Sequence, residues 1–178
     1  WRYPAIEGVS GLLAAGAIVA FGPTWRGLAV MIMLLALVPV VVIDLEHKLI
    51  PNIVVYPAAT LALTAMVLHE PSRWWVPVSG ALGAAGFLGL LHLIKPKGMG
   101  LGDVKLALLL GAVLGASVIP ALFIAFLAGS ILGAVLIARV GKGARHTQIP
   151  FGPYLALGAL LALWVGPALI SIYTDRVL

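Results

Sequence analysis

Two aspartates in this sequence stand where a long apolar run meets a polar segment. Asp44 follows the uncharged run of about residues 27–43, and Asp103 follows a glycine-rich segment and precedes the apolar run from Val104. Two carboxyl groups that lie close together do not ionise independently, so one keeps its proton while the other is charged. Such a pair can take a proton from water and polarise a carbonyl at the same time. The residue types therefore predict aspartyl protease chemistry, provided that the two side chains meet.

Each aspartate also has a structural interpretation that the sequence leaves open. Asp103 can cap the following helix by accepting its free backbone N–H groups, a role that is compatible with catalysis. Asp44 can be a solvated residue at the membrane surface, paired with Lys48 one helical turn further on. Glu46 lies on a different helix face from Asp44, so we expect it to be solvated. We expect His92 to be a buried histidine with a hydrogen-bond partner.

The glycines before Asp103 are Gly98, Gly100 and Gly102. Glycine lacks a Cβ atom, so it can adopt left-handed turns and lets another backbone lie close against it. We expect a loop that could hold an extended peptide. The helix that follows, at about residues 104–117, has about 14 residues and is roughly 21 Å long. We expect the loop with Asp103 to dip below the membrane surface into a protein-lined, water-filled recess.

The composition identifies an integral membrane protein. Of the 178 residues, 62% are hydrophobic and 10% are charged, and the mean hydropathy is +1.15; a soluble globular protein has an apolar share of about 45–50%. There is no cysteine, which excludes disulfides and thiolate metal sites, and no metal is expected. The net charge of +5 is assigned to loops that set the membrane orientation rather than to nucleic-acid binding.

The apolar runs predict an all-α fold, a polytopic transmembrane helical bundle with about seven spans. No repeat or soluble segment divides the chain, so residues 1–178 are expected to form a single membrane-embedded domain. Glycines recur within several spans at spacings that let neighbouring helices approach closely. The expected spans cover about residues 5–22, 27–43, 53–68, 75–94, 104–117, 121–137 and 149–172.

The basic residues predict the orientation of the bundle. When seven spans alternate across the membrane, eight basic residues fall on one side and three on the other. By the positive-inside rule the larger group faces the cytoplasm, and Asp44 and Asp103 fall on that same side. The larger group is Arg2, Lys48, Lys95, Lys97, Lys105, Arg139, Lys142 and Arg145, and the smaller is Arg26, Arg73 and Arg176.

Four motifs occur in order along the chain. They are Arg2-Tyr3-Pro4 with Glu7, then Ile43-Asp44-Leu45-Glu46-His47-Lys48-Leu49-Ile50-Pro51-Asn52, then Gly98-Met99-Gly100-Leu101-Gly102-Asp103-Val104-Lys105-Leu106, and Ile149-Pro150-Phe151-Gly152-Pro153-Tyr154. This series resembles the bacterial prepilin peptidases, also called type IV leader peptidases. The glycine-any-glycine-aspartate element (GxGD) is shared with the presenilin-type intramembrane aspartyl proteases, so the specificity comes from the combination.

The resemblance implies an enzyme of the bacterial inner (cytoplasmic) membrane. Such enzymes remove the short basic leader of type IV prepilins and type II secretion pseudopilins, cutting after a glycine at the cytoplasmic face, and proteolysis needs no cofactor. The resemblance makes Asp44 and Asp103 the catalytic aspartates, with Gly100 and Gly102 shaping the loop beside the second. Glu46 is a candidate for attracting the basic leader. The lysines near the motifs would repel it and are assigned to lipid headgroups and topology.

The family also has a feature that this sequence does not show. Many members carry, ahead of the first span, a cytoplasmic segment with paired cysteines that is associated with zinc and with N-methylation of the mature pilin. This chain has no cysteine and begins at Trp1, so we expect that segment to be absent from it. S-adenosylmethionine would be a cofactor only if methyltransferase activity is retained.

A small proton-coupled membrane transporter is the alternative function, with Asp44 and Asp103 as relay groups. A carrier is expected to hold its acids near the bilayer midplane, often with weak internal symmetry. Here both acids lie at one edge and no duplication is visible. An inactive assembly subunit would explain the hydrophobicity but not the glycine segment or the paired acids. The sequence therefore favours the peptidase.

Overall fold

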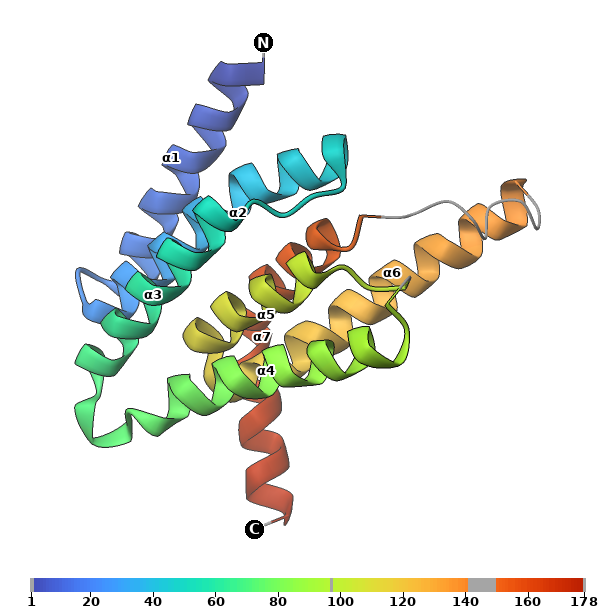
Figure 1. The fold of residues 1–178 in the computed structure, drawn as a ribbon. Coiled ribbons are helices and arrows are strands. Elements are labelled where there is room, and N and C mark those ends of the chain that lie inside the picture. Colours follow the sequence, from blue (N-terminus) through green and yellow to red (C-terminus); the bar gives the residue numbers. More distant parts are fainter. Residues whose placement is uncertain (1, 97, 141–149, 178) are drawn as a thin grey trace.

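The computed structural model describes residues 2–96, 98–140 and 150–177 of the chain. These residues form seven α-helices and two short 3-10 helices, and this part of the chain contains no strand (Figure 1). Four residues named in the predictions above lie outside the described residues: Lys97, Lys142, Arg145 and Ile149. The elements are α1 (Arg2–Phe21), α2 (Trp25–His47), α3 (Asn52–His69), η1 (Pro71–Arg73), α4 (Trp75–Ile94), α5 (Leu101–Leu114), η2 (Gly115–Ser117), α6 (Val118–Val140) and α7 (Gly152–Val177).

The predicted helical membrane bundle is confirmed, with about six membrane-capable segments rather than seven. In the described part of the chain, five segments are long and apolar enough to cross a membrane, and Ile6–Phe21 is a shorter apolar helix. One of the five, Leu101–Leu136, contains both α5 and most of α6. The sequence analysis predicts two separate spans for this segment. α5 has 14 residues, the predicted length, but it begins at Leu101 instead of Val104.

The chain reverses direction between α5 and α6 at Gly115. Its φ of +54° lies in the region that favours glycine. After this turn α6 runs in the same direction as α4. Val76 of α4 and Ile119 of α6 line a shared cavity, and further along both helices Phe87 of α4 contacts Phe126 of α6, with ring centroids 6.2 Å apart. α5 is therefore antiparallel to both helices, and α6 packs mainly on α7.

Glycines bring the backbones of neighbouring helices almost into contact. A Cβ added at Gly80 of α4 would lie 2.5 Å from the carbonyl oxygen of Gly111 in α5, and one added at Gly111 would overlap the Gly80 carbonyl. α6 and α7 meet in the same way where Gly158 faces the Ala121 carbonyl. Such contacts hold helices together where lipid offers no hydrophobic driving force. The close helix packing predicted for the recurring glycines is thus found at Gly111, whereas Gly133, in a similar spacing on α6, faces open space.

The replacement Gly111→Ala is expected to lower the free energy of unfolding by about 1–3 kcal/mol, because the added methyl group forces α4 and α5 apart. The measurement is equilibrium unfolding in mixed detergent micelles. Gly133→Ala is the matched control, since a Cβ at that position meets nothing within 4 Å. Equal stability of the two variants would show that the glycine contact between α4 and α5 does not stabilise the bundle.

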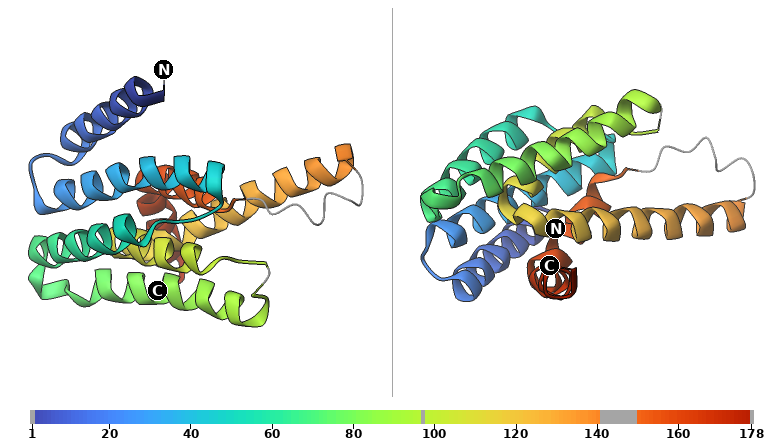
Figure 2. Two further views of the ribbon diagram at one scale, coloured as in Figure 1. Left: turned by 45° about the horizontal axis from the view of Figure 1, so that its top comes forward. Right: turned by 90° about the horizontal axis from the view of Figure 1, so that it is seen from below.

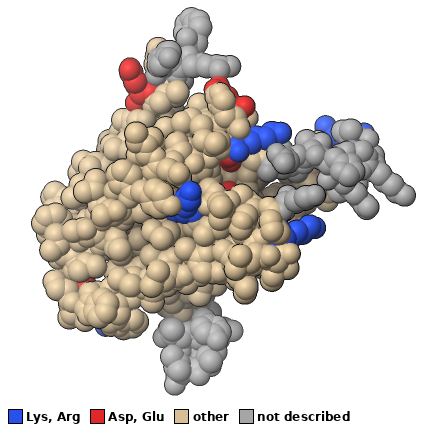
Figure 3. Space-filling model, in the orientation of Figure 1, with Lys and Arg blue, Asp and Glu red and all other residues tan. Residues whose placement is uncertain are grey.

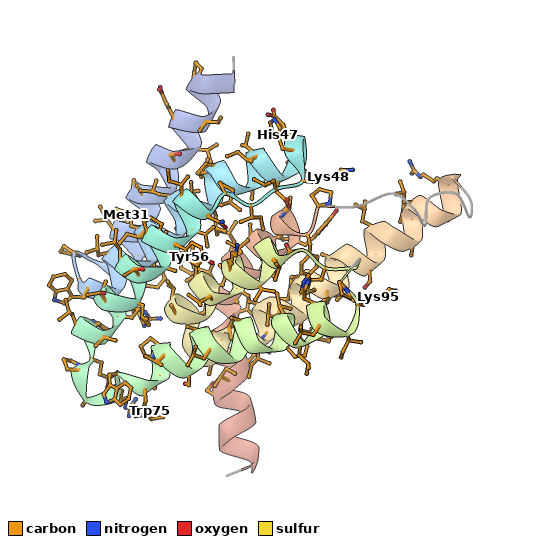
Figure 4. The ribbon with its side chains drawn as sticks, in the orientation of Figure 1. Met31, His47, Lys48, Tyr56, Trp75 and Lys95 are labelled. Carbon is orange, nitrogen blue, oxygen red and sulfur yellow. The ribbon has the colours of Figure 1, made fainter. Side chains whose placement is uncertain are left out.

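Charged side chains gather at one end of the bundle. Figure 4 shows His47, Lys48 and Lys95 at this end and Trp75 at the opposite end. On the face drawn in Figure 3, most lysine and arginine side chains lie toward the same end, and most of the remaining surface is uncharged. In both views of Figure 2, α6 extends past its neighbours at this end. The side of the membrane that this end faces stays a prediction.

Candidate active site

Asp44 lies in the last turn of α2 and is bound by a residue much later in the sequence, Gly152. Its side chain is only 4% exposed, and its Oδ2 atom accepts a hydrogen bond of 2.9 Å from the backbone N–H of Gly152. Gly152 is the first residue of α7, so the N-terminus of this helix contacts the Asp44 carboxyl group. The alternative in which Asp44 is a solvated surface residue paired with Lys48 is therefore wrong, because tertiary packing buries it.

Asp103 is the third residue of α5 rather than a loop residue. The helix begins earlier than predicted because two reciprocal bonds cap it: the Gly100 N–H donates to Asp103 Oδ2 at 3.1 Å, and the Asp103 N–H donates to the Gly100 carbonyl at 3.1 Å. The side chain is 7% exposed. Capping and burial thus occur together, as the sequence interpretation allowed.

The two aspartates lie on helices that meet inside the bundle. They are the only buried polar or charged side chains in the described part of the chain. Their helices, α2 and α5, pack on each other and on α7, and Ile50, just after α2, contacts Gly102, the neighbour of Asp103. Burying a carboxyl group costs free energy unless its environment compensates for the loss of water. Two such groups on neighbouring helices are therefore candidates for function rather than for stability.

The glycines near Asp103 act through close approach and not through left-handed turns. Within the described residues the glycines with positive φ are Gly22 and Gly115, so none of the three glycines before Asp103 uses the left-handed conformation that glycine allows. A Cβ at Gly102 would lie 2.8 Å from the Cβ of Ile50. Because Ile50 is buried at the chain segment that follows α2, Gly102 allows the α2 and α5 ends to meet.

The other two glycines have looser surroundings. An added Cβ at Gly100 would lie 3.2 Å from Asp103 Oδ2, within reach of the carboxyl group itself. At Gly98 the nearest atoms, at 3.3 Å, belong to the Lys95 side chain, which can move aside. The three positions should therefore differ in their tolerance of a methyl group.

The replacement Gly102→Ala is expected to reduce activity by roughly 10²-fold, because the new methyl group displaces the start of α5 and with it the adjacent Asp103. Gly98→Ala is the matched control and is expected to keep a rate close to that of the parent. The measurement is the initial rate of substrate cleavage by both variants, after circular dichroism has shown that both are folded. If Gly102→Ala is as active as Gly98→Ala, the contact with Ile50 does not position the site.

Two further side chains hold the segments around the candidate site. A ring nitrogen of His92, Nδ1, lies 2.7 Å from the carbonyl oxygen of Met99, just before the start of α5. The predicted hydrogen-bond partner is confirmed, but the side chain is half-buried rather than buried. Lys105 donates to Asn52 Oδ1 at 2.9 Å and lies over the ring of Tyr56, with its Nζ atom 5.5 Å from the centroid. Lys105 thus ties α5 to α3, a role missed when it was assigned to lipid headgroups.

The structure adds one residue to the site and leaves another untested. Gly152 was quoted only as part of the late motif, yet its N–H binds Asp44 and an added Cβ would lie 2.6 Å from Asp44 Oδ2.

Glu46 is exposed, as predicted, while its contact with a leader remains a prediction. Within the described residues, no three His, Asp or Glu side chains are grouped to hold a metal ion.

The sequence comparisons agree with this geometry. The model of the type IV leader peptidase family matches residues 28–138. This chain belongs to the type IV leader peptidase family. Both aspartates lie inside the matched range, so the family assignment and the buried pair concern the same part of the molecule. No solved structure matches the chain.

Several type IV leader peptidase relatives align with almost the whole chain. The chain is 34% identical over 178 residues to a protein of Stutzerimonas stutzeri, covering 97% of this chain and 61% of the relative. It is 33% identical over 178 residues to a protein of Pseudomonas aeruginosa, covering 97% and 61%. It is 31% identical over 179 residues to one of Bacillus subtilis, covering 100% and 72%. All three are named prepilin leader peptidase/N-methyltransferase. The chain thus spans about three fifths of the length of the first two relatives.

Proposed function

We propose that this protein is a prepilin leader peptidase. It is an aspartyl endopeptidase that cuts the basic leader from type IV prepilins or type II secretion pseudopilins after a glycine. The observation that carries the proposal is the burial of Asp44 and Asp103 on neighbouring helices, where they are the only polar or charged side chains buried among the described residues. The names of the relatives support the same reaction.

In the proposed reaction one carboxyl group is ionised and the other is protonated. The ionised group takes a proton from water as the water oxygen attacks the scissile carbonyl carbon, and the protonated group donates a hydrogen bond to the carbonyl oxygen. Collapse of the tetrahedral intermediate breaks the C–N bond, and the departing nitrogen receives a proton from the pair. The backbone N–H groups of Gly152 and Gly100 fix one oxygen of each carboxyl group. Substrate therefore meets carboxyl groups that are already oriented, which lowers the cost of reaching the transition state.

The charge distribution supports an active site at the cytoplasmic face of the inner membrane. Lys48 and Lys95 lie at the bundle end where α2 finishes with Asp44 in its last turn (Figure 4). Positive charge near the ends of spans is retained on the cytoplasmic side. Residues 1–178 would form the single membrane-embedded peptidase domain, with the bilayer as its solvent and a prepilin or pseudopilin as its partner. Glu46, exposed next to this end, would attract the basic leader.

Methyl transfer is not part of this proposal. The relatives carry N-methyltransferase in their names, and such a reaction would use S-adenosylmethionine, which has a polar adenosine and a charged amino acid. Within the described residues, the cavity between α4 and α6 has no charged residue on its walls, so that cavity does not fit this cofactor. S-adenosylmethionine would be a cofactor only if the chain retains methyltransferase activity.

The experiment is to incubate the purified protein with a prepilin and to determine the product masses. We expect one cut, directly after the glycine that ends the leader. A prepilin with that glycine replaced by valine is the control substrate and is expected to stay intact. Absence of cleavage of the native prepilin, or equal cleavage of both substrates, would contradict the proposed function.

A further inference from the structure

An apolar groove opens between α4 and α6 on the lipid-facing surface. It encloses a cavity of about 740 Å³. No charged residue lines it, and the hydroxyl of Ser79, its one hydroxyl group, donates to the backbone carbonyl of Val76 at 3.0 Å. Apart from Ser79 and the indole of Trp75, the side chains that line the groove are apolar. The groove therefore suits an apolar occupant.

The helices that form this groove leave its walls uncovered along most of their length. α4 packs on α5, and α6 packs on α7, so α4 and α6 contact each other little. Phe123 and Ile119 on the α6 wall are 69% and 67% exposed. On the α4 wall a Cβ added at Gly83 would meet nothing within 4 Å. From Trp75 to Phe87 the α4 wall is about 18 Å long at 1.5 Å per residue. This length is more than half of the hydrocarbon thickness of a bilayer.

A row of contacting aromatic rings lies between the groove and the segment that holds Asp44. Phe87 and Phe126, both on the groove wall, have centroids 6.2 Å apart. Phe126 in turn lies 5.1 Å from Phe151. The next residue along the chain is Gly152, whose N–H binds Asp44. One end of an object lying in the groove would therefore be close to the segment that holds Asp44.

We propose that this groove is the docking site for the apolar helix of the substrate itself, an inference that rests on the proposed peptidase function. A prepilin that carries its leader directly before an apolar helix would lay that helix along α4 and α6 and present the leader junction to the aspartates. Small residues on a groove wall let a second helix approach closely, and Gly83 is such a residue. The aromatic contacts that link one end of the groove to the Gly152 segment favour the substrate helix over a lipid chain, which would have no reason to end there.

The test compares Gly83→Leu with Gly86→Leu on full-length prepilin in lipid nanodiscs. Both glycines lie on α4 and have nothing within 4 Å of an added Cβ, but only Gly83 lines the groove. Gly83→Leu fills the groove and is expected to lower kcat/KM by at least about tenfold, whereas Gly86→Leu is expected to match the parent. Equal rates for Gly83→Leu and the parent would overturn the docking site while leaving the peptidase function intact. If the parent itself does not cut prepilin, it is the peptidase function that fails.

Photo-crosslinking supplies a second measurement that does not depend on turnover. A benzoylphenylalanine in place of Phe123, which is exposed on the groove wall, is expected to form an adduct with the apolar helix of a bound prepilin. The same probe in place of Leu61, which is 59% exposed on α3, is the control and is expected to give none. Adducts at Phe123 with lipid alone, or with a second copy of this chain, would contradict the proposal.

Discussion

The replacements Asp44→Asn and Asp103→Asn are each expected to reduce leader cleavage by at least about 10³-fold, while the protein stays folded. An asparagine has almost the same shape as an aspartate, and its amide oxygen can still accept the hydrogen bond from Gly152 or from Gly100. What the variant loses is the ability to take or give a proton, and general acid–base catalysis by one side chain supplies about 10²–10⁴-fold. The measurement is the single-turnover rate of prepilin cleavage.

The control for this pair is Glu70→Gln, which also removes one carboxyl group. Glu70 lies in the connection between α3 and η1, is exposed, and forms an ion pair of 3.4 Å with Arg73. Its replacement is expected to leave the rate unchanged, because an exposed ion pair contributes little. A folded Asp44→Asn or Asp103→Asn variant that cleaves as fast as Glu70→Gln would remove that aspartate from the mechanism.

The second large effect is expected for Gly152→Ala. The added Cβ would lie 2.6 Å from Asp44 Oδ2 and 3.2 Å from Asp44 Cγ, too close for both groups to keep their positions. Either the carboxyl group turns away or the start of α7 moves, and in both cases the hydrogen bond that orients Asp44 is weakened. Displacements of about 1 Å at a reacting group cost roughly 10²-fold in rate. We therefore expect a loss of about that size in kcat.

Gly133→Ala is the control for Gly152→Ala, because position 133 of α6 is open. Both variants receive one methyl group, so a general effect of glycine replacement would appear in both. Comparison of kcat and KM separates misplacement of Asp44 from a loss of substrate affinity. Unchanged kcat for Gly152→Ala would mean that the α7 contact has no role in orienting the carboxyl group.

The sequence predicted the helices and singled out the two aspartates that the structure buries, because both features depend on local pattern. Uninterrupted apolar runs define the spans, and an acid at the end of such a run is conspicuous. The start of α5 was misplaced because Gly100 and Gly102 favour a loop, whereas the reciprocal bonds between Gly100 and Asp103 extend the helix back to Leu101. A capping contact of this kind depends on side-chain geometry that residue type alone does not specify.

The features that were missed are tertiary contacts. Gly152 and Asp44 are far apart in the sequence, and nothing local to Gly152 indicates a bond to a carboxyl group. Likewise, Gly80 and Gly83 look equivalent in a regular glycine series, yet Gly80 packs against α5 and Gly83 lines an open groove. Which glycine meets a neighbouring helix depends on how the helices cross, and only the folded structure supplies that.

The most direct measurement is a double-mutant comparison of Asp44→Asn, Asp103→Asn and the doubly substituted protein in single-turnover cleavage of prepilin. Two aspartates that share one proton act as a unit, so the loss of either should abolish the unit, and the double variant should be no slower than the slower single variant. If the two losses multiply, or if either single variant cleaves at the parental rate, then the two carboxyl groups do not form one catalytic pair.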